Sequence, residues 1–256
     1  MQNVICLFAG IKVKINYPYP SFERFAAGYL LPVDAAFDME ITVSEADVLR
    51  ERDGAEGNYS DAYLQTLAVY RKFCTAAAER GVLLFHGSAL AMDGNAYIFS
   101  APSGTGKSTH AALWRKVFGN RVQMINDDKP LLRFFEKETL VYGTPWNGKH
   151  RLGGNFSAPL KGICFLERGQ KNAVRALTAR ESLTRLLSQC FLPDDESAAQ
   201  AVLSMVKEIV QKTPIWLLTC NISEEAARIS CATLTGKREW LSEEDINGQT
   251  EEFTRE

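Results

Sequence analysis

The sequence predicts an α/β protein with a mixed sheet and flanking helices, preceded by a small β-rich part. Three observations lead to this prediction. A short apolar run at 96–99 is followed by a loop rich in glycine and serine and then by an apolar, helix-like run at 111–118. Strand-like and helix-like segments alternate beyond it as far as residue 234. Residues 1–58, in contrast, hold short alternating runs that prolines interrupt.

Each element is predicted from its own pattern. Residues 2–16 and 37–43 alternate between apolar and polar side chains, as strands do, and two glycines mark a loop at 53–58. Ser60 can cap a helix that runs to about residue 80, where Gly81 stops it. The remaining strands are expected at 82–92, 95–99, 122–125, 131–135, 139–142, 160–167 and 215–218, and the remaining helices at 179–190, 196–211 and 224–234.

These elements divide the chain into a β-rich N-terminal part (1–58), a main α/β domain (59–241) and a polar C-terminal tail (242–256). Asp93-Gly94 is a strong signal for a hairpin turn between the strands at 82–92 and 95–99. The strand that leads into the glycine-bearing loop is therefore expected to come from a hairpin.

Composition limits the possible functions. The chain has 256 residues, of which 46% are hydrophobic and 23% charged, and its formal net charge is -2. Nucleic-acid binding is not expected, because phosphate backbones require clustered positive charge. No apolar run is long enough to span a membrane, and residues 1–10 resemble a strand more than a signal peptide. The six cysteines form no C-x-x-C pair, which disfavours a zinc site and fits a reducing cytoplasm.

The loop after residues 96–99 has the composition of a phosphate-binding P-loop. Gly104 and Gly106 allow a tight turn close to phosphate oxygens, and the start of the following helix favours an anion. Lys107 is expected to reach the β- and γ-phosphates, and the Ser108 hydroxyl to ligate Mg²⁺. The pattern normally begins with glycine, where this chain has Ala101, and a turn that binds nothing is the alternative. The residues expected to contact the nucleotide are Ser103, Gly104, Thr105, Gly106, Lys107, Ser108 and Thr109.

Two acids follow the strand at 122–125. Asp127 and Asp128 provide one carboxylate that can hold Mg²⁺ and one that can take a proton from an attacking hydroxyl, and their mutual repulsion tends to raise one pKa. A solvated acidic turn is the alternative. His86 lies in an apolar run, where a histidine is either a buried core residue or a catalytic group.

The loop at 143–151 combines cations with an aromatic residue. Lys149 and Arg151, beside Trp146, are candidates to contact phosphate or an acidic substrate. An ordinary surface loop is equally compatible with this composition.

Taken in order, His86-Gly87, the hairpin, the segment 102–108 and Asp127-Asp128 resemble the catalytic domain of HPr kinase/phosphorylase and, more widely, the ATP-dependent phosphoenolpyruvate carboxykinases. The resemblance covers about residues 82–170. It implies a carboxykinase-like P-loop fold for the main domain, ATP and Mg²⁺ as cofactors, and an active-site role for His86. It also implies Asp127 as the metal-associated acid and Asp128 as its neighbour, without deciding which is the base. HPr kinases are hexamers, so the resemblance further implies a homo-oligomer.

The function that follows is a kinase that transfers the γ-phosphoryl group of ATP to a hydroxyl acceptor, which is a small molecule, a peptide or a protein serine. The alternative is a nucleotide-binding accessory or switch protein with little turnover. This alternative is favoured by Thr109, which stands where the family has a glutamate. Residues 144–149 stand where true HPr kinases have a Glu-Ile-Arg-Gly-Leu-Gly-like segment, so the resemblance does not extend to recognition of HPr itself. Neither a nucleic acid nor a membrane is expected as a partner.

Overall fold

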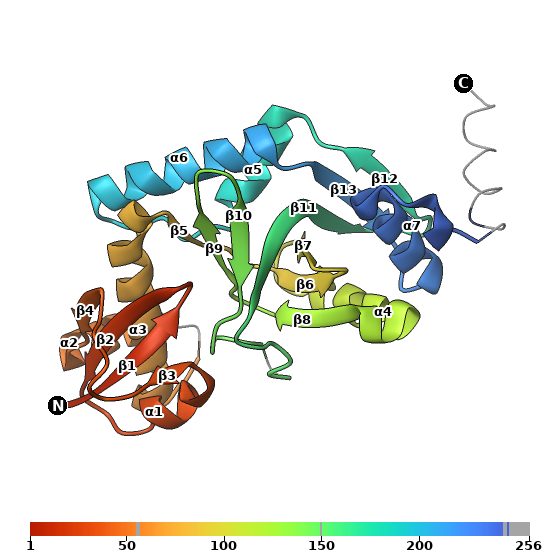
Figure 1. Ribbon diagram of the computed structural model, residues 1–256. Helices are drawn as coiled ribbons and strands as arrows, with labels where there is room; N and C mark the ends of the chain where they lie inside the picture. Colours follow the sequence, from red (N-terminus) through yellow and green to blue (C-terminus); the bar gives the residue numbers. More distant parts are fainter. Residues whose placement is uncertain (55–56, 149, 243–244, 246–256) are drawn as a thin grey trace.

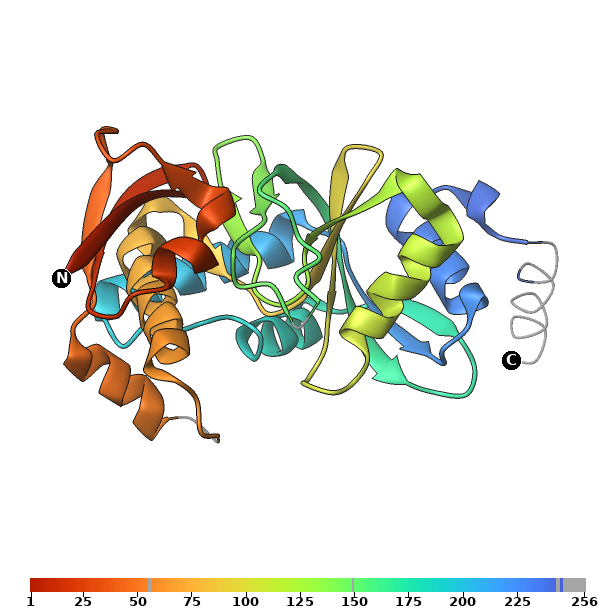
Figure 2. The ribbon, with the colours of Figure 1, turned by 90° about the horizontal axis from the view of Figure 1, so that it is seen from below.

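The computed structural model describes residues 1–54, 57–148, 150–242 and 245, and within them the chain forms two sheets and seven α-helices (Figure 1). A four-stranded sheet in the order β3-β1-β2-β4 belongs to the N-terminal part, and a nine-stranded mixed sheet forms the centre. Seen from below, the N-terminal sheet lies with α3 at one end of the molecule, and α4 and α7 lie at the other (Figure 2).

The bounds of the elements are as follows. The strands are β1 (Gln2–Phe8), β2 (Ile11–Tyr17), β3 (Leu30–Leu31), β4 (Met39–Thr42), β5 (Val82–Leu84), β6 (Ser88–Met92), β7 (Asn95–Ser100), β8 (Val122–Asn126), β9 (Leu131–Phe134), β10 (Thr139–Tyr142), β11 (Ser157–Arg168), β12 (Ala173–Ala176) and β13 (Ile215–Cys220). The α-helices are α1 (Phe22–Phe25), α2 (Glu45–Asp53), α3 (Asp61–Ala77), α4 (Lys107–Phe118), α5 (Ala179–Leu187), α6 (Glu196–Lys212) and α7 (Glu224–Thr235).

The N-terminal part contains a helix that the sequence analysis did not predict. The region before residue 58 was expected to hold strands and a loop, yet α2 begins after Ser44. The signal is a capping box, in which the Ser44 hydroxyl accepts from the Asp47 N–H (3.3 Å) and the Asp47 carboxylate accepts from the Ser44 N–H (2.8 Å). β12 was likewise not predicted, and it pairs with β13.

Helix α3 packs on the N-terminal sheet. Leu64 and Phe73 of α3 belong to the same buried cluster as Phe8 and Ile15 of the β1–β2 hairpin. Apolar periodicity predicted the helix itself but not the sheet that it covers. The boundary at residue 58 stays a prediction.

The strand predicted over residues 82–92 is in fact two strands. β5 pairs with β9, β6 pairs with β7 and β8, and residues 85–87 cross between the two pairings. The His86 N–H donates to the Gln189 carbonyl (2.8 Å), and the Gly87 N–H donates to the Asp128 carbonyl (3.0 Å). A Cβ at position 87 would lie 2.9 Å from the Phe99 carbonyl oxygen, so this crossing requires glycine.

The centre of the large sheet has helices on both faces. β6 and β7 pair antiparallel through a turn with positive φ at Asp93 (50°) and Gly94 (79°), whereas β7 is parallel to β11 and β11 to β13. Because successive side chains of a strand point to opposite faces, Ile98 packs in the cluster that includes α6, and Phe99 packs with Trp114 of α4. Because these central strands are buried on both faces of the sheet, they appear in the sequence as continuous apolar runs.

Within the described residues, none of the helices combines the length and apolar character needed to pass through a bilayer. All six cysteines lie in the described part of the chain and are free thiols.

Candidate functional site

Residues 101–106 form a tight loop between the end of β7 and the first turn of α4. Gly104 (φ 77°) and Gly106 (φ 128°) adopt backbone conformations that side chains disfavour. A Cβ on either glycine would meet no described atom within 4 Å, so conformation and not close packing requires glycine here. The first turn of α4, which is fully described, contains no acidic side chain, and its N–H groups and dipole favour an anion.

Lys107 begins α4 and folds back on this loop. Its Nζ donates to the carbonyl of Ala101 (2.8 Å) and to that of Pro102 (3.4 Å). Burial lowers the pKa of Lys107, while the negative charges of Asp128 and Asp127 oppose that shift. The cation therefore lies within electrostatic reach of both carboxylates. The neighbouring Ser108 is exposed, as are Ser103 and Thr109, and Thr105 is half-buried.

Asn126, the last residue of β8, holds the turn that carries the acid pair. Its Oδ1 accepts from the N–H groups of Asp128 (2.8 Å) and Lys129 (2.7 Å). Asp127 is 6% exposed, and its carboxylate accepts from the Ser88 hydroxyl (2.7 Å). The Asp128 side chain is 30% exposed and pairs with Lys129 Nζ at 2.5 Å. The two adjacent acids therefore occupy different environments, one buried and one open.

His86 lies beside the open acid. Its Nε2 is 3.5 Å from an Asp128 carboxylate oxygen. Burial is the largest cause that lowers the pKa of His86, followed by the positive charge of Lys107, and Asp128 opposes both. The ring is consequently neutral at pH 7. The structure thus brings His86, Lys107 and Asp128 together from three separate segments.

The donor set suits Mg²⁺. This ion takes oxygen ligands and is typically bound through one or two carboxylates, with waters and substrate phosphates completing its shell. The Ser108 hydroxyl and the Asp127 carboxylate are ligands of this kind. Among the described residues, no group of three or more His, Cys, Asp or Glu side chains could hold a metal, so a protein-only cage of that composition is absent there.

The loop between β10 and β11 contacts the acid pair through a residue that the sequence analysis missed. Asn147 Oδ1 accepts from the Asp127 N–H (3.3 Å). Trp146 was predicted to contact substrate, but its ring is 4% exposed, stacks on Tyr70 with centroids 4.1 Å apart, and donates through Nε1 to the Thr66 carbonyl (2.9 Å). This burial corrects the prediction, since the ring is part of the core.

Of the two cations predicted in that loop, only Arg151 lies within the described residues. Arg151 is exposed and lines a pocket with Arg24 of the N-terminal part and Tyr63 of α3, and the acid pair is not among the residues that line it. Lys149 lies outside the described residues.

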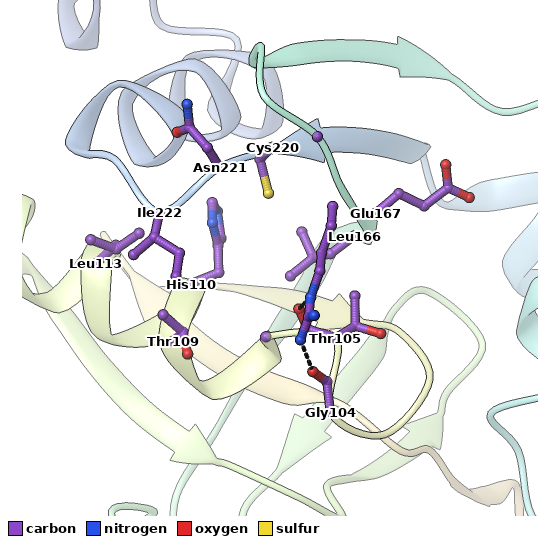
Figure 3. A pocket seen from close by; sticks show the side chains of 13 residues that line it. Gly104, Thr105, Thr109, His110, Leu113, Leu166, Glu167, Cys220, Asn221 and Ile222 are labelled. Carbon is purple, nitrogen blue, oxygen red and sulfur yellow. Dashed lines mark hydrogen bonds between the residues drawn. The ribbon is translucent and has the colours of Figure 1, made fainter.

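A pocket of about 360 Å³ lies on the other side of the loop at 101–106, between α4 and the ends of β11 and β13 (Figure 3). Leu113, Leu166 and Ile222 form its apolar walls. Arg168, at the end of β11, donates to the carbonyls of Gly104 (2.5 Å) and Thr105 (3.2 Å) and so ties the pocket to the loop. No short motif marks Arg168, because its partners lie more than 60 positions away.

His110 is a second residue that the sequence analysis missed. It lines this pocket from α4 and is 3% exposed, with its Nε2 2.9 Å from the Ser230 hydroxyl. Burial lowers the pKa of His110 to about 4, so the ring is neutral at pH 7. Ser230 is 120 positions away, so no local pattern indicates the contact.

No known protein family matches the sequence, and no curated protein matches it. Among solved structures, the chain is similar to the HPr(Ser) kinase/phosphatase from Coxiella burnetii, with a TM-score of 0.37 and 10% sequence identity. The superposition covers 68% of this chain and 99% of that chain. This distant similarity does not assign an activity.

Proposed function

We propose that the chain is an ATP-dependent phosphotransferase that moves the γ-phosphoryl group of ATP to a hydroxyl acceptor, such as a serine of a peptide or protein. One observation supports it most strongly: a glycine-bearing loop, its lysine, an acid pair and a neutral histidine converge on one place. Lys107, Asp128 and His86 lie within electrostatic reach of one another. Phosphoryl transfer needs little from a protein beyond positioning and charge stabilisation, and these groups supply both.

The transfer step assigns different roles to the two acids. The acceptor oxygen attacks the γ-phosphorus, the bond to the β-phosphate oxygen breaks, and ADP leaves. The acceptor proton passes to the Asp128 carboxylate, which is the more exposed of the pair. His86, 3.5 Å away, orients that carboxylate. Lys107 and the N–H groups at the start of α4 stabilise negative charge on the phosphates.

Asp127 and Ser108 would hold Mg²⁺, which neutralises phosphate charge when bound. The Ser88 hydroxyl and the Asn147 side chain orient Asp127, through its carboxylate and its backbone N–H respectively. Asp127 is therefore the better positioned of the two acids for a fixed ligand role. A homo-oligomer and a cytoplasmic location stay predictions.

The test is transfer of γ-labelled phosphate from ATP, with Mg²⁺, to a pool of metabolites and peptides. Lys107→Ala should lower the transfer rate roughly 10²-fold or more, as removal of one preorganised charge-stabilising donor does. Asp128→Asn should lower it by about 10²- to 10⁴-fold, the usual contribution of a general base. Lys116→Ala is the matched control, because Lys116 lies on the same helix but pairs with Glu224 on the surface.

If the Lys107→Ala variant transfers labelled phosphate at the wild-type rate, the proposal is refuted. If wild-type protein binds ATP tightly and yields no labelled product, the accessory or switch function replaces the kinase. That second candidate rests on Thr109, whose hydroxyl stands where a family glutamate would supply another acid.

A further inference from the structure

The pocket beside the loop at 101–106 has no role in the transfer step proposed above. The pocket begins at Gly104 and Thr105 and extends away from them between Leu166 on one side and Leu113 and Ile222 on the other (Figure 3). Its volume of about 360 Å³ falls in the range of small-molecule sites, roughly 300–1,000 Å³. A ligand whose phosphates lie on the loop would extend its remaining part into this space.

Among the described residues, one nitrogen of His110 in the wall of this pocket has no hydrogen-bond partner. Trp114 Nε1 can only donate, and it donates to Ser230 Oγ (2.8 Å). The single Ser230 proton goes to the Ala227 carbonyl (3.0 Å). All three contacts form at once only if Ser230 Oγ also accepts from His110 Nε2 (2.9 Å), and this arrangement, which we adopt, places the ring proton on Nε2.

His110 Nδ1 is consequently an acceptor. It is buried and has no hydrogen-bond partner within the part of the chain that the structure describes. Figure 3 places the ring between Ile222 and Cys220, among the residues that line the pocket. Buried acceptors are normally satisfied, so an acceptor of this kind beside a pocket indicates a ligand that donates to it.

We propose that this pocket binds the nucleoside part of the nucleotide, and that His110 Nδ1 accepts a hydrogen bond from an exocyclic amino group of a purine such as adenine. The inference rests on the proposed function, because it takes the phosphates to lie on the loop at 101–106. The apolar walls contact the faces of the base, and the amino group donates to the unmet acceptor of the His110 ring. His110 is thus a specificity-determining residue.

The test compares three probes by isothermal titration calorimetry in the presence of Mg²⁺: ATP, the triphosphate of purine riboside, which lacks the amino group, and inorganic triphosphate. ATP should bind wild-type protein about tenfold more tightly than the purine riboside compound, the value of one hydrogen bond. It should bind more tightly than inorganic triphosphate by a larger factor. In His110→Phe, the ratio between ATP and the purine riboside compound should fall to about 1.

A second variant keeps the test valid if His110→Phe does not fold. Ile222 is 79% exposed, so Ile222→Ala should fold normally and still weaken ATP binding several-fold by removing part of the pocket wall. Leu203→Ala is the matched control, because Leu203 is an exposed apolar residue on α6, outside the pocket lining. It should leave ATP binding unchanged.

The outcomes separate this inference from the proposed function. Equal affinity for ATP and inorganic triphosphate would overturn the nucleoside pocket while leaving phosphate binding at the loop intact. A preference for ATP over the purine riboside compound that persists in His110→Phe would overturn the role of His110. Failure of all three probes to bind would overturn the proposed function, and this inference with it.

Discussion

Replacing Trp146 with alanine should destabilise the protein strongly. The ring is 4% exposed, stacks on Tyr70, and meets Phe8 and Phe25 edge-on with centroids 5.3 and 5.5 Å away. Its Nε1 donates to the Thr66 carbonyl. Truncation of a buried aromatic to alanine costs about 3–5 kcal/mol, from lost transfer free energy and the cavity left behind. A typical domain has only about 5–15 kcal/mol of stability in total.

Urea unfolding followed by circular dichroism would measure this loss as a lower midpoint at unchanged slope. The thermal midpoint should fall by roughly 6–20 °C, since 1 kcal/mol shifts it about 2–4 °C in a protein of this size. Leu152→Ala is the control from the same loop: its side chain is 40% exposed, and the change should stay within about 0.5 kcal/mol.

Loss of ligand binding without loss of stability would refute the assignment of Trp146 to the core. If Trp146→Ala unfolds within about 1 kcal/mol of wild type and loses nucleotide or acceptor binding instead, the ring serves a ligand and its burial has been misinterpreted. Trp146→Phe refines the test, because it keeps an aromatic ring against Tyr70 and removes the donor to Thr66 together with part of the ring volume. It should cost less than the alanine substitution.

Two further predictions concern the site. Burial lowers the pKa of His110 from 6.5 to about 4, so its contribution to the free energy of unfolding is complete above pH 6.5 and is lost, by about 3 kcal/mol in all, as the pH falls towards 4. Urea unfolding across this range should show a weaker pH dependence in His110→Phe, and equal dependence in both proteins would contradict the assignment. Asn126→Ala leaves the N–H groups of Asp128 and Lys129 without their acceptor, which should cost about 1–3 kcal/mol in urea unfolding and slow phosphoryl transfer. A full transfer rate in a destabilised Asn126→Ala would limit Asn126 to a structural role.

Functional residues that lie close together along the chain were predictable from the sequence. The glycines at 104 and 106, Lys107 and the helix after them lie within a few residues of one another, so local rules suffice to recognise the strand, loop and helix. Asp93-Gly94 predicted the hairpin correctly for the same reason, because the turn conformation depends on those two residues. Asp127 and Asp128 were identified as candidates because they end the strand that directly follows the P-loop helix in the sequence.

Contacts between distant segments were decided by the tertiary structure. The apolar run at 82–92 gave no means to see that residues 85–87 cross between two strand pairings, and this crossing is what carries His86 to Asp128. Trp146 lies in a loop whose composition is typical of a surface loop, yet the N-terminal sheet and α3 bury it. Whether an aromatic or a cation faces solvent depends on which elements cover it, and that information is not local.

The sequence by itself therefore determined the α/β class, the loop with its lysine and the candidate acids, because each depends on neighbouring residues and on backbone preferences. Only the tertiary structure decided which acid is buried and how His86 reaches the open one. It also decided that one His110 nitrogen beside the pocket has no partner among the described residues. The physical reason is that burial, charge proximity and hydrogen-bond satisfaction are set by packing between segments as far as 120 positions apart.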